Sequence, residues 1–192
     1  MSEYVTNDTD KYTASGGNKV TFQIIRNSES RGSYKNPSLR QRDKIIFKNE
    51  ETKETFTLEN CQTVVSNFKE GKPKTPSENT LRANKKFTIQ FLSSNASKFK
   101  GPVFNVQNTD TEGLGLINEN GIDVLNESDN RPYRIHSNLL KNSKTPLPMA
   151  SDGCPMYPSD QIEEFESFLN KNNVKPGDVL KGIIKEEIIY GP

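Results

Sequence analysis

The sequence has 192 residues and a mass of 21.7 kDa, a length that predicts one domain with or without a tail. Residues of the AVILMFWYC class make up 31% of the chain and charged residues 27%, so the hydrophobic core is expected to be small. The 26 Lys and Arg nearly balance the 25 Asp and Glu, and a sequence pI near 7.7 argues against nucleic acid as a partner, because nucleic-acid-binding domains carry a basic surface and a pI above about 9.

The N-terminal 18 residues are rich in Thr, Asn, Asp and Gly and show no periodic apolar pattern. They predict a flexible tail that precedes a single domain over residues 19–192. This terminus has no basic segment followed by an apolar one, so we expect no signal peptide and synthesis in the cytoplasm. No apolar run approaches the ~20 residues that span a bilayer, so we expect no insertion into a membrane.

Short segments that alternate apolar and polar residues follow the tail, and this alternation is typical of half-buried strands. In chain order the segments cover residues 20–24, 44–49, 54–59, 86–92, 102–106, 113–117 and 132–136, and a last strand is expected over 179–189. Gly and Asn mark the connections between them, as in the turns of β-rich domains. The chain is therefore predicted to be mainly β.

One segment has the pattern of a helix. Pro158, Ser159 and Asp160 offer an N-cap, apolar residues recur at i, i+3 and i+7 from Ile162, and the pair of asparagines at 172–173 ends the segment. The fold class expected is thus a β-rich α+β domain with one prominent helix. Its core is expected to contain Val20, Phe22, Ile24, Ile45, Phe47, Phe56, Leu58, Phe87, Ile89, Ile135, Ile162, Phe165, Leu169, Val179 and Ile183.

The two cysteines, Cys61 and Cys154, show neither a CxxC motif nor a spacing to His that suits a zinc site. We therefore expect no metal and no organic cofactor. Two separate thiols are favoured over a disulfide, which the sequence leaves open. Cys61 is predicted to be a packed thiol, whereas Cys154 is a candidate for a reactive one.

The single histidine, His136, precedes Cys154 by 18 residues, and Cys154 ends a Ser-Asp-Gly-Cys turn directly before the helix. An imidazole that takes the proton of a thiol is the minimum needed for thiol nucleophilic catalysis. Gly153 allows a tight turn in which consecutive backbone N–H groups face an oxyanion. A structural histidine and a packed cysteine explain the same residues, so the residues leave both interpretations open. A papain-like enzyme is set aside because its cysteine precedes its histidine.

The stretch Ile135-His136-Ser137-Asn138, followed by Ser151-Asp152-Gly153-Cys154, resembles the active-site signature of the L,D-transpeptidase (YkuD-type) catalytic domain. Fourteen residues separate His136 from Ser151, within the range of that family. The resemblance covers about residues 19–190, although the His and Ser-x-Gly-Cys parts carry its specificity. The front half is most similar to small YkuD-like proteins of uncharacterised function and to type VI secretion effector forms.

The resemblance implies a β-sandwich or barrel with the helix behind the nucleophile, and it implies a role for each residue of the signature. Cys154 would accept the acyl group of a peptidoglycan stem peptide as a thioester, with His136 as base and then as acid. The backbone carbonyl of Ser137 would orient the imidazole ring. The N–H groups of Gly153 and Cys154 would bind the oxyanion, and Ser151 would brace the turn.

The sequence departs from the signature at two positions. Asp152 replaces the usual histidine and brings a negative charge near the thiol, which raises a thiol pKa. Met156 replaces the usual Asn or Arg, so donor recognition is expected to differ. Arg134 lies two residues before His136, on the same face of a strand, and is a candidate carboxylate partner in place of the missing residue. A solvated surface arginine is the alternative interpretation of Arg134.

The function expected is that of an L,D-transpeptidase or L,D-carboxypeptidase on peptidoglycan, and the sequence does not decide between the two. The absence of a leader and the resemblance to effector forms together imply an antibacterial toxin that a secretion system delivers to the periplasm of a target cell. An immunity protein would then be its partner. The alternative is a catalytically weakened module that keeps the fold and binds peptidoglycan or has a structural role.

Overall fold

The computed structural model describes residues 18–27, 43–63, 80–81, 85–108, 116–117, 123–124, 133–149 and 153–187. The predicted tail, apart from residue 18, lies outside the described residues, as do Ser151 and Asp152. In chain order the elements are β1 (Val20–Asn27), β2 (Asp43–Asn49), β3 (Thr55–Cys61), β4 (Thr80–Leu81), β5 (Lys85–Ser94), β6 (Pro102–Asn108), β7 (Leu116–Ile117), β8 (Asp123–Val124), β9 (Arg134–Ser137), β10 (Met156–Tyr157), α1 (Ile162–Lys171) and β11 (Val179–Glu187).

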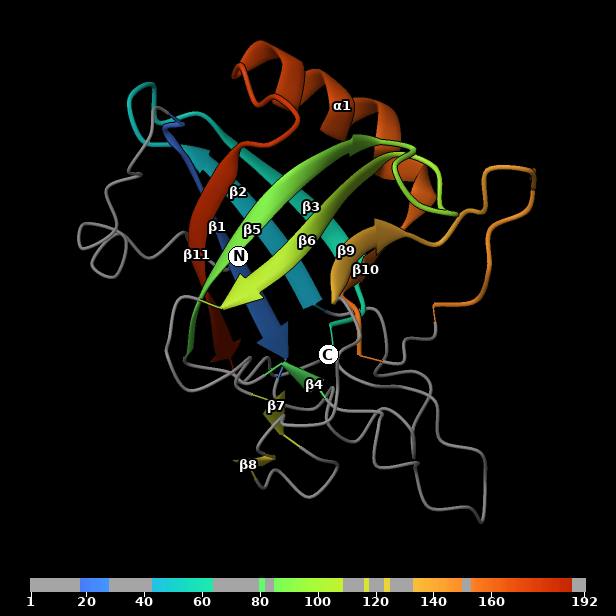
Figure 1. The fold of residues 1–192 in the computed structure, drawn as a ribbon, viewed down its shortest axis with the longest axis horizontal. Coiled ribbons are helices and arrows are strands. Elements are labelled where there is room, and N and C mark those ends of the chain that lie inside the picture. The colour runs from blue at the N-terminus through green and yellow to red at the C-terminus, as the bar shows by residue number, and fades with distance from the viewer. Residues whose placement is uncertain are drawn as a thin grey trace, which may run out of the picture.

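Eight strands form one sheet in the order β10-β9-β6-β5-β11-β1-β2-β3, and β4, β7 and β8 form a second, small sheet. The large sheet curls until its two edges meet, because Gln62, just after β3, exchanges backbone hydrogen bonds of 2.9 and 2.8 Å with Met156 of β10. The result is a nearly closed barrel (Figure 1). The prediction of a mainly β fold with one helix is confirmed for the described residues.

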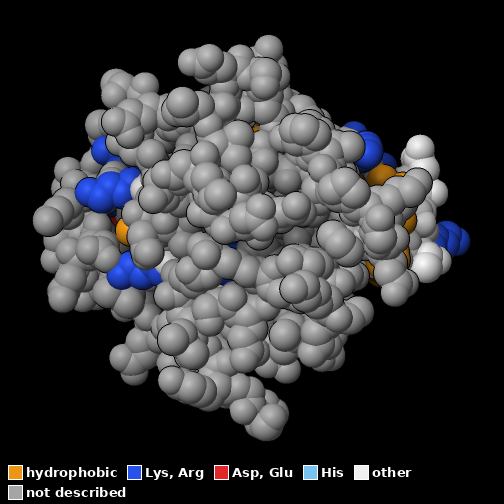
Figure 2. All heavy atoms as spheres, turned by 90° about the horizontal axis from the view of Figure 1, so that it is seen from below, with side chains coloured by type: hydrophobic (Ala, Val, Ile, Leu, Met, Phe, Trp, Pro, Cys, Tyr) orange, Lys and Arg blue, Asp and Glu red, His pale blue; other side chains and the backbone are white. Residues whose placement is uncertain are grey.

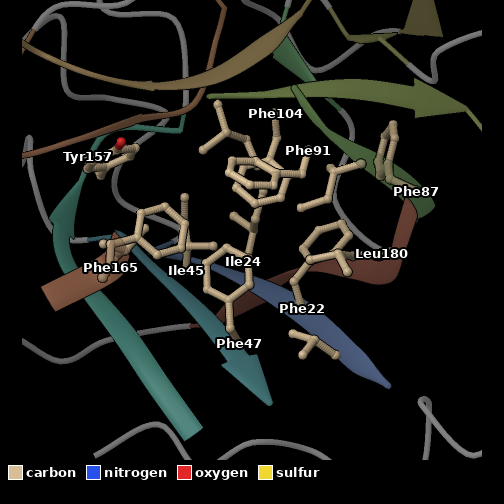
Figure 3. Packing of buried hydrophobic residues seen from close by; sticks show 14 of the residues in the cluster. Phe22, Ile24, Ile45, Phe47, Phe87, Phe91, Phe104, Tyr157, Phe165 and Leu180 are labelled. Atoms are coloured by element: carbon tan, nitrogen blue, oxygen red, sulfur yellow. The ribbon is translucent and has the colours of Figure 1, made fainter. Parts of the chain in front are cut away.

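The alternation read from the sequence directs one face of each strand into the barrel. Phe22 and Ile24 of β1 and Phe47 of β2 are almost fully buried. Figure 3 shows how rings from several strands and from the helix point toward one another inside the barrel. The Phe104 ring of β6, for example, lies 5.9 Å from that of Phe47 between centroids. Burial of such aromatic surface is the main favourable term in folding a chain with so few apolar residues.

The helix α1 lies across one end of the barrel (Figure 1). Its buried face consists of Phe165, Phe168 and Leu169. Phe165 packs 5.0 Å from Phe47 and 5.6 Å from Phe56, measured between ring centroids. Because the apolar stripe of the helix closes the barrel end, the segment just before the helix, which holds Cys154, is fixed against the sheet.

The helix start corrects one prediction. A 3₁₀ turn over Ser159–Gln161 precedes α1, and neither Pro158 nor Gln161 forms a side-chain capping bond. The Gln161 amide instead accepts a 2.8 Å hydrogen bond from the N–H of Glu59 and donates one of 2.8 Å to its carbonyl. The glutamine thus pairs with the outer edge of β3 as a neighbouring strand would, and it ties the helix to that edge.

The last strand corrects the predicted core. Leu180 and Ile184 are buried, whereas Val179 is 38% exposed and Ile183 is half-buried. Gly182 lies between the two buried positions and pairs with Phe22 of β1. Phe56 and Ile162 are only partly buried, at the margin of the core.

Candidate active site

A short parallel pairing places the segment that holds Cys154 beside the strand that carries His136. Met156 of β10 lies opposite His136 of β9, and the N–H of His136 donates to the carbonyl of Pro155 at 3.2 Å. Cys154 and Arg134 each lie two residues before these partners, and the backbone N–H of Arg134 donates to Sγ of Cys154 at 3.5 Å. The thiol therefore lies against the strand that carries the histidine.

The hydrogen bond from the Arg134 N–H fixes the position of Sγ relative to β9. Cys154 is half-buried, and Gly153 before it is buried and has φ +127°. That backbone conformation favours glycine, so the glycine of the predicted turn is required by its geometry.

The imidazole of His136 is 7% exposed and is held by its own strand. Nδ1 lies 2.7 Å from the backbone carbonyl of Ser137, the carbonyl to which the resemblance gave this position. A carbonyl only accepts, so Nδ1 carries the hydrogen and Nε2 keeps its lone pair. The hydroxyl of Ser137 donates to the carbonyl of Lys100 at 2.6 Å and anchors the strand from its other face.

A phenylalanine that the sequence analysis did not single out covers the imidazole. The ring of Phe99 stacks on that of His136, with centroids 3.9 Å apart and planes 12° from parallel. Phe99 belongs to the turn between β5 and β6, which is remote from the signature in sequence. An aromatic residue between two lysines in a polar turn was the one signal available for it.

Burial lowers the pKa of His136 from its usual 6.5 to about 4. The hydrogen bond to Ser137 opposes this shift, and the charges of Lys98 and Arg134 add to it. The imidazole is therefore neutral at physiological pH, the form that accepts a proton from a thiol.

The surroundings of the histidine are basic although the chain carries a net charge of only +1. Residues 95–101 and 134–149 contain five cations and no Asp or Glu: Lys98, Lys100, Arg134, Lys141 and Lys144. At the right-hand edge of the view in Figure 2, Lys or Arg side chains of the described residues lie beside hydrophobic ones. Of these cations, Lys98 and Arg134 lie close enough for their charges to act on the imidazole.

Arg134, predicted as a carboxylate partner, is half-buried and anchored. Its Nε donates to Oδ1 of Asn105 at 3.1 Å. This bond restrains the guanidinium. Arg134 belongs to β9, the strand whose backbone N–H donates to Sγ of Cys154. Planar, immobilised guanidinium groups are suited to carboxylates, because they bind both oxygens at once.

Asn138 is a second residue to which the sequence analysis gave no role. Its Nδ2 donates to the carbonyl of Leu147 at 2.7 Å, and its Oδ1 accepts from the N–H of Ser159 at 2.9 Å. The N–H of Leu147 returns a 2.7 Å bond to the carbonyl of Asn138. One side chain thus joins the strand end after His136, the following loop and the turn before the helix.

The remaining predicted residues lie as follows. Met156 is 3% exposed and, as the register partner of His136, lies on the same face of the sheet. Both cysteines are free thiols, and Cys61 is fully buried in the core, as predicted. Burial raises the pKa of the Cys61 thiol well above its usual value, so this thiol is inert. Ser151 and Asp152 lie outside the described residues.

No family model, curated protein or solved structure matches the chain. Within the described residues, no three His, Cys, Asp or Glu side chains are grouped so as to hold a metal ion. The described helix is too short and too polar to cross a membrane.

Proposed function

We propose that this protein is a cysteine acyl-transferase or hydrolase of the L,D-transpeptidase type that acts on peptidoglycan stem peptides. One observation carries the proposal: His136, whose Nδ1 donates to the Ser137 carbonyl, belongs to the strand on which the backbone N–H of Arg134 donates to Sγ of Cys154. The resemblance of the stretches around His136 and Cys154 to the signature of YkuD-type domains supplies the substrate class.

The chemistry proceeds in two halves. Nε2 of His136 takes the thiol proton of Cys154, and the thiolate attacks a peptide carbonyl. The oxyanion that forms accepts hydrogen bonds from the backbone N–H groups of Gly153 and Cys154. The imidazolium then protonates the departing amine, the C–N bond breaks, and a thioester remains on Cys154.

The second half decides the type of reaction. An amine that attacks the thioester gives a new peptide bond, and water gives a shortened stem. In either case His136 takes a proton from the attacking group, and the thiolate of Cys154 leaves and is reprotonated. Arg134, fixed by Asn105, binds a carboxylate of the donor peptide close to the scissile bond.

The experiment is digestion of purified peptidoglycan sacculi followed by mass analysis of the muropeptides. Wild type should remove a terminal D-Ala, exchange it for another D-amino acid or form 3–3 cross-links, and Cys154→Ala should do none of these. Cys61→Ala is the matched control, because it removes the other thiol from a site outside the chemistry and should retain the products. Binding of sacculi by wild type without any new muropeptide would support the weakened module instead.

The effector role is proposed on the resemblance to type VI forms. Production of wild type in the periplasm of a bacterial host should stop growth, whereas Cys154→Ala in the periplasm and wild type in the cytoplasm should not. Growth arrest by Cys154→Ala would contradict a toxic action through peptidoglycan chemistry.

A further inference from the structure

We propose that Phe99 is a positioning residue for the candidate base: its ring fixes the plane of the His136 imidazole and excludes water from it, so that the neutral ring presents Nε2 to Cys154. The catalytic part of this inference rests on the proposed function. The effect on the imidazole does not, because it follows from the contact between the two rings.

Two contacts constrain the imidazole in different ways. The 2.7 Å hydrogen bond from Nδ1 to the Ser137 carbonyl sets the rotation of the ring in its own plane. The Phe99 stack, with centroids 3.9 Å apart and planes 12° from parallel, sets the tilt of that plane. A hydrogen bond without the stack would leave the ring free to tilt about it, so both contacts are needed for a fixed position of Nε2.

The turn that carries Phe99 is joined to the segment just after the histidine. The N–H of Lys100 donates to the carbonyl of Leu139 at 2.7 Å, and the N–H of Lys141 donates to the carbonyl of Lys98 at 3.0 Å. Phe99 and Leu140, between these bonds, form an isolated β-bridge. Phe99 is therefore held by the backbone on both sides, as a supporting residue must be.

The charges that act on the imidazole come from two elements. Lys98 lies on the same turn as Phe99 and Arg134 on the same strand as His136, and the Sγ of Cys154, on the segment before β10, accepts from the backbone N–H of Arg134. Both cations disfavour the imidazolium, and the Nζ of Lys98 lies 5.3 Å from the centroid of the Phe99 ring. Because Phe99 is uncharged, its removal acts on the histidine through water and through any displacement of Lys98.

The chain has one histidine, so an NMR titration of the imidazole ring reports on His136 without assignment. Wild type should titrate near pH 4. Phe99→Ala should raise this midpoint toward 6.5 by about one unit or more, a tenfold gain in proton affinity. Phe99→Tyr keeps the stack and should keep the wild-type midpoint, and Phe99→Leu, which keeps an apolar side chain without the ring, should lie between.

Two variants serve as controls. Phe56→Ala removes another partly buried ring, one that stacks on Phe165 and Phe168, and should leave the histidine midpoint unchanged. Lys98→Met should raise the midpoint less than Phe99→Ala does, which separates the loss of a charge from the entry of water. A wild-type midpoint in folded Phe99→Ala, or an equal shift in Phe56→Ala, would overturn the inference.

Turnover on stem peptides supplies the second readout. Phe99→Ala should lower kcat at neutral pH about tenfold or more with little change in KM, and should move the acid limb of kcat/KM upward with the NMR midpoint. A wild-type kcat in Phe99→Ala would overturn the positioning role. Because the titration needs no substrate, it tests the effect of Phe99 on the imidazole even where the muropeptide assay finds no product, so the two failures are distinguishable.

Discussion

The backbone N–H of Arg134 donates to Sγ of Cys154 at 3.5 Å, at the end of the parallel ladder between β9 and β10. In a continuing ladder a backbone carbonyl would accept this bond. Here a thiol takes that place, so the pairing of two short strands positions a sulfur atom. The same strand carries His136 two residues later, which makes β9 the framework of the site.

Burial of His136 makes folding depend on pH. The pKa of this histidine is lowered to about 4, whereas an unfolded chain binds the proton near 6.5, so between these values the unfolded state holds more protons. Stability should therefore fall as pH falls through this window, by about 2 kcal/mol at pH 5 and about 3 kcal/mol at pH 4.

Urea unfolding of wild type and His136→Asn at pH 7 and pH 5 measures this dependence. Asparagine does not titrate, so the variant should lose about 2 kcal/mol less than wild type over that interval. The carboxylates titrate alike in both proteins and cancel in the comparison. Equal losses in the two proteins would show that the imidazole titrates normally in the folded state.

Arg134 should confer a preference for donor peptides that end in a carboxylate. Arg134→Gln removes the charge and the guanidinium but leaves the backbone N–H that donates to Cys154. We expect kcat/KM on a carboxylate-ended stem peptide to fall at least tenfold, the size of a lost charge-assisted hydrogen bond, with little change on the corresponding amide. Lys144→Gln, which removes an exposed cation from the following loop, is the control and should retain the preference.

Asn138 should stabilise the contact between the loop after β9 and the turn before α1. Asn138→Ala loses the bonds to Leu147 and Ser159 and should cost about 2 kcal/mol of unfolding free energy. Asn142→Ala, at an exposed position of the same loop, is the control and should change the unfolding free energy little. Chemical denaturation compares the two variants, and a loss in Asn138→Ala no larger than in Asn142→Ala would show that the two bonds contribute nothing.

Gly182 allows the neighbouring strands β1 and β11 to lie close to each other in the barrel. A Cβ at this position would lie 2.1 Å from the carbonyl oxygen of Phe22, so Gly182→Ala must separate the two strands. We expect a loss at or above the upper end of the 1–3 kcal/mol typical of overpacking. Gly177→Ala, whose Cβ meets no atom within 4 Å but whose φ is +94°, should cost about 1 kcal/mol. A smaller loss at Gly182 than at Gly177 would contradict the close approach.

Local pattern was sufficient to predict most strands and the helix, because alternation and the apolar stripe decide which face each element buries. It was not sufficient in β11, where two adjacent isoleucines, Ile183 and Ile184, fit either register. Which of the two isoleucines is buried depends on how Gly182 packs against Phe22, and this is a contact between segments that are distant in sequence.

The candidate site, too, was predicted only in part from the sequence. His136, Cys154 and the Ser137 carbonyl were predicted because their spacing resembles a known signature. Phe99 and Asn138 were missed because their roles arise only when the β5–β6 turn, the loop after β9 and the helix start are brought together. Supporting residues of this kind have no local sequence pattern.

Intact-protein mass spectrometry after incubation with a tetrapeptide stem tests directly whether Cys154 is the nucleophile. We expect an adduct with the mass of the peptide minus its leaving residue, carried by the fragment that contains Cys154. The adduct should be absent in Cys154→Ala and should form much more slowly in His136→Asn. An adduct on Cys61, or unmodified wild type that leaves the peptide intact, would contradict this expectation.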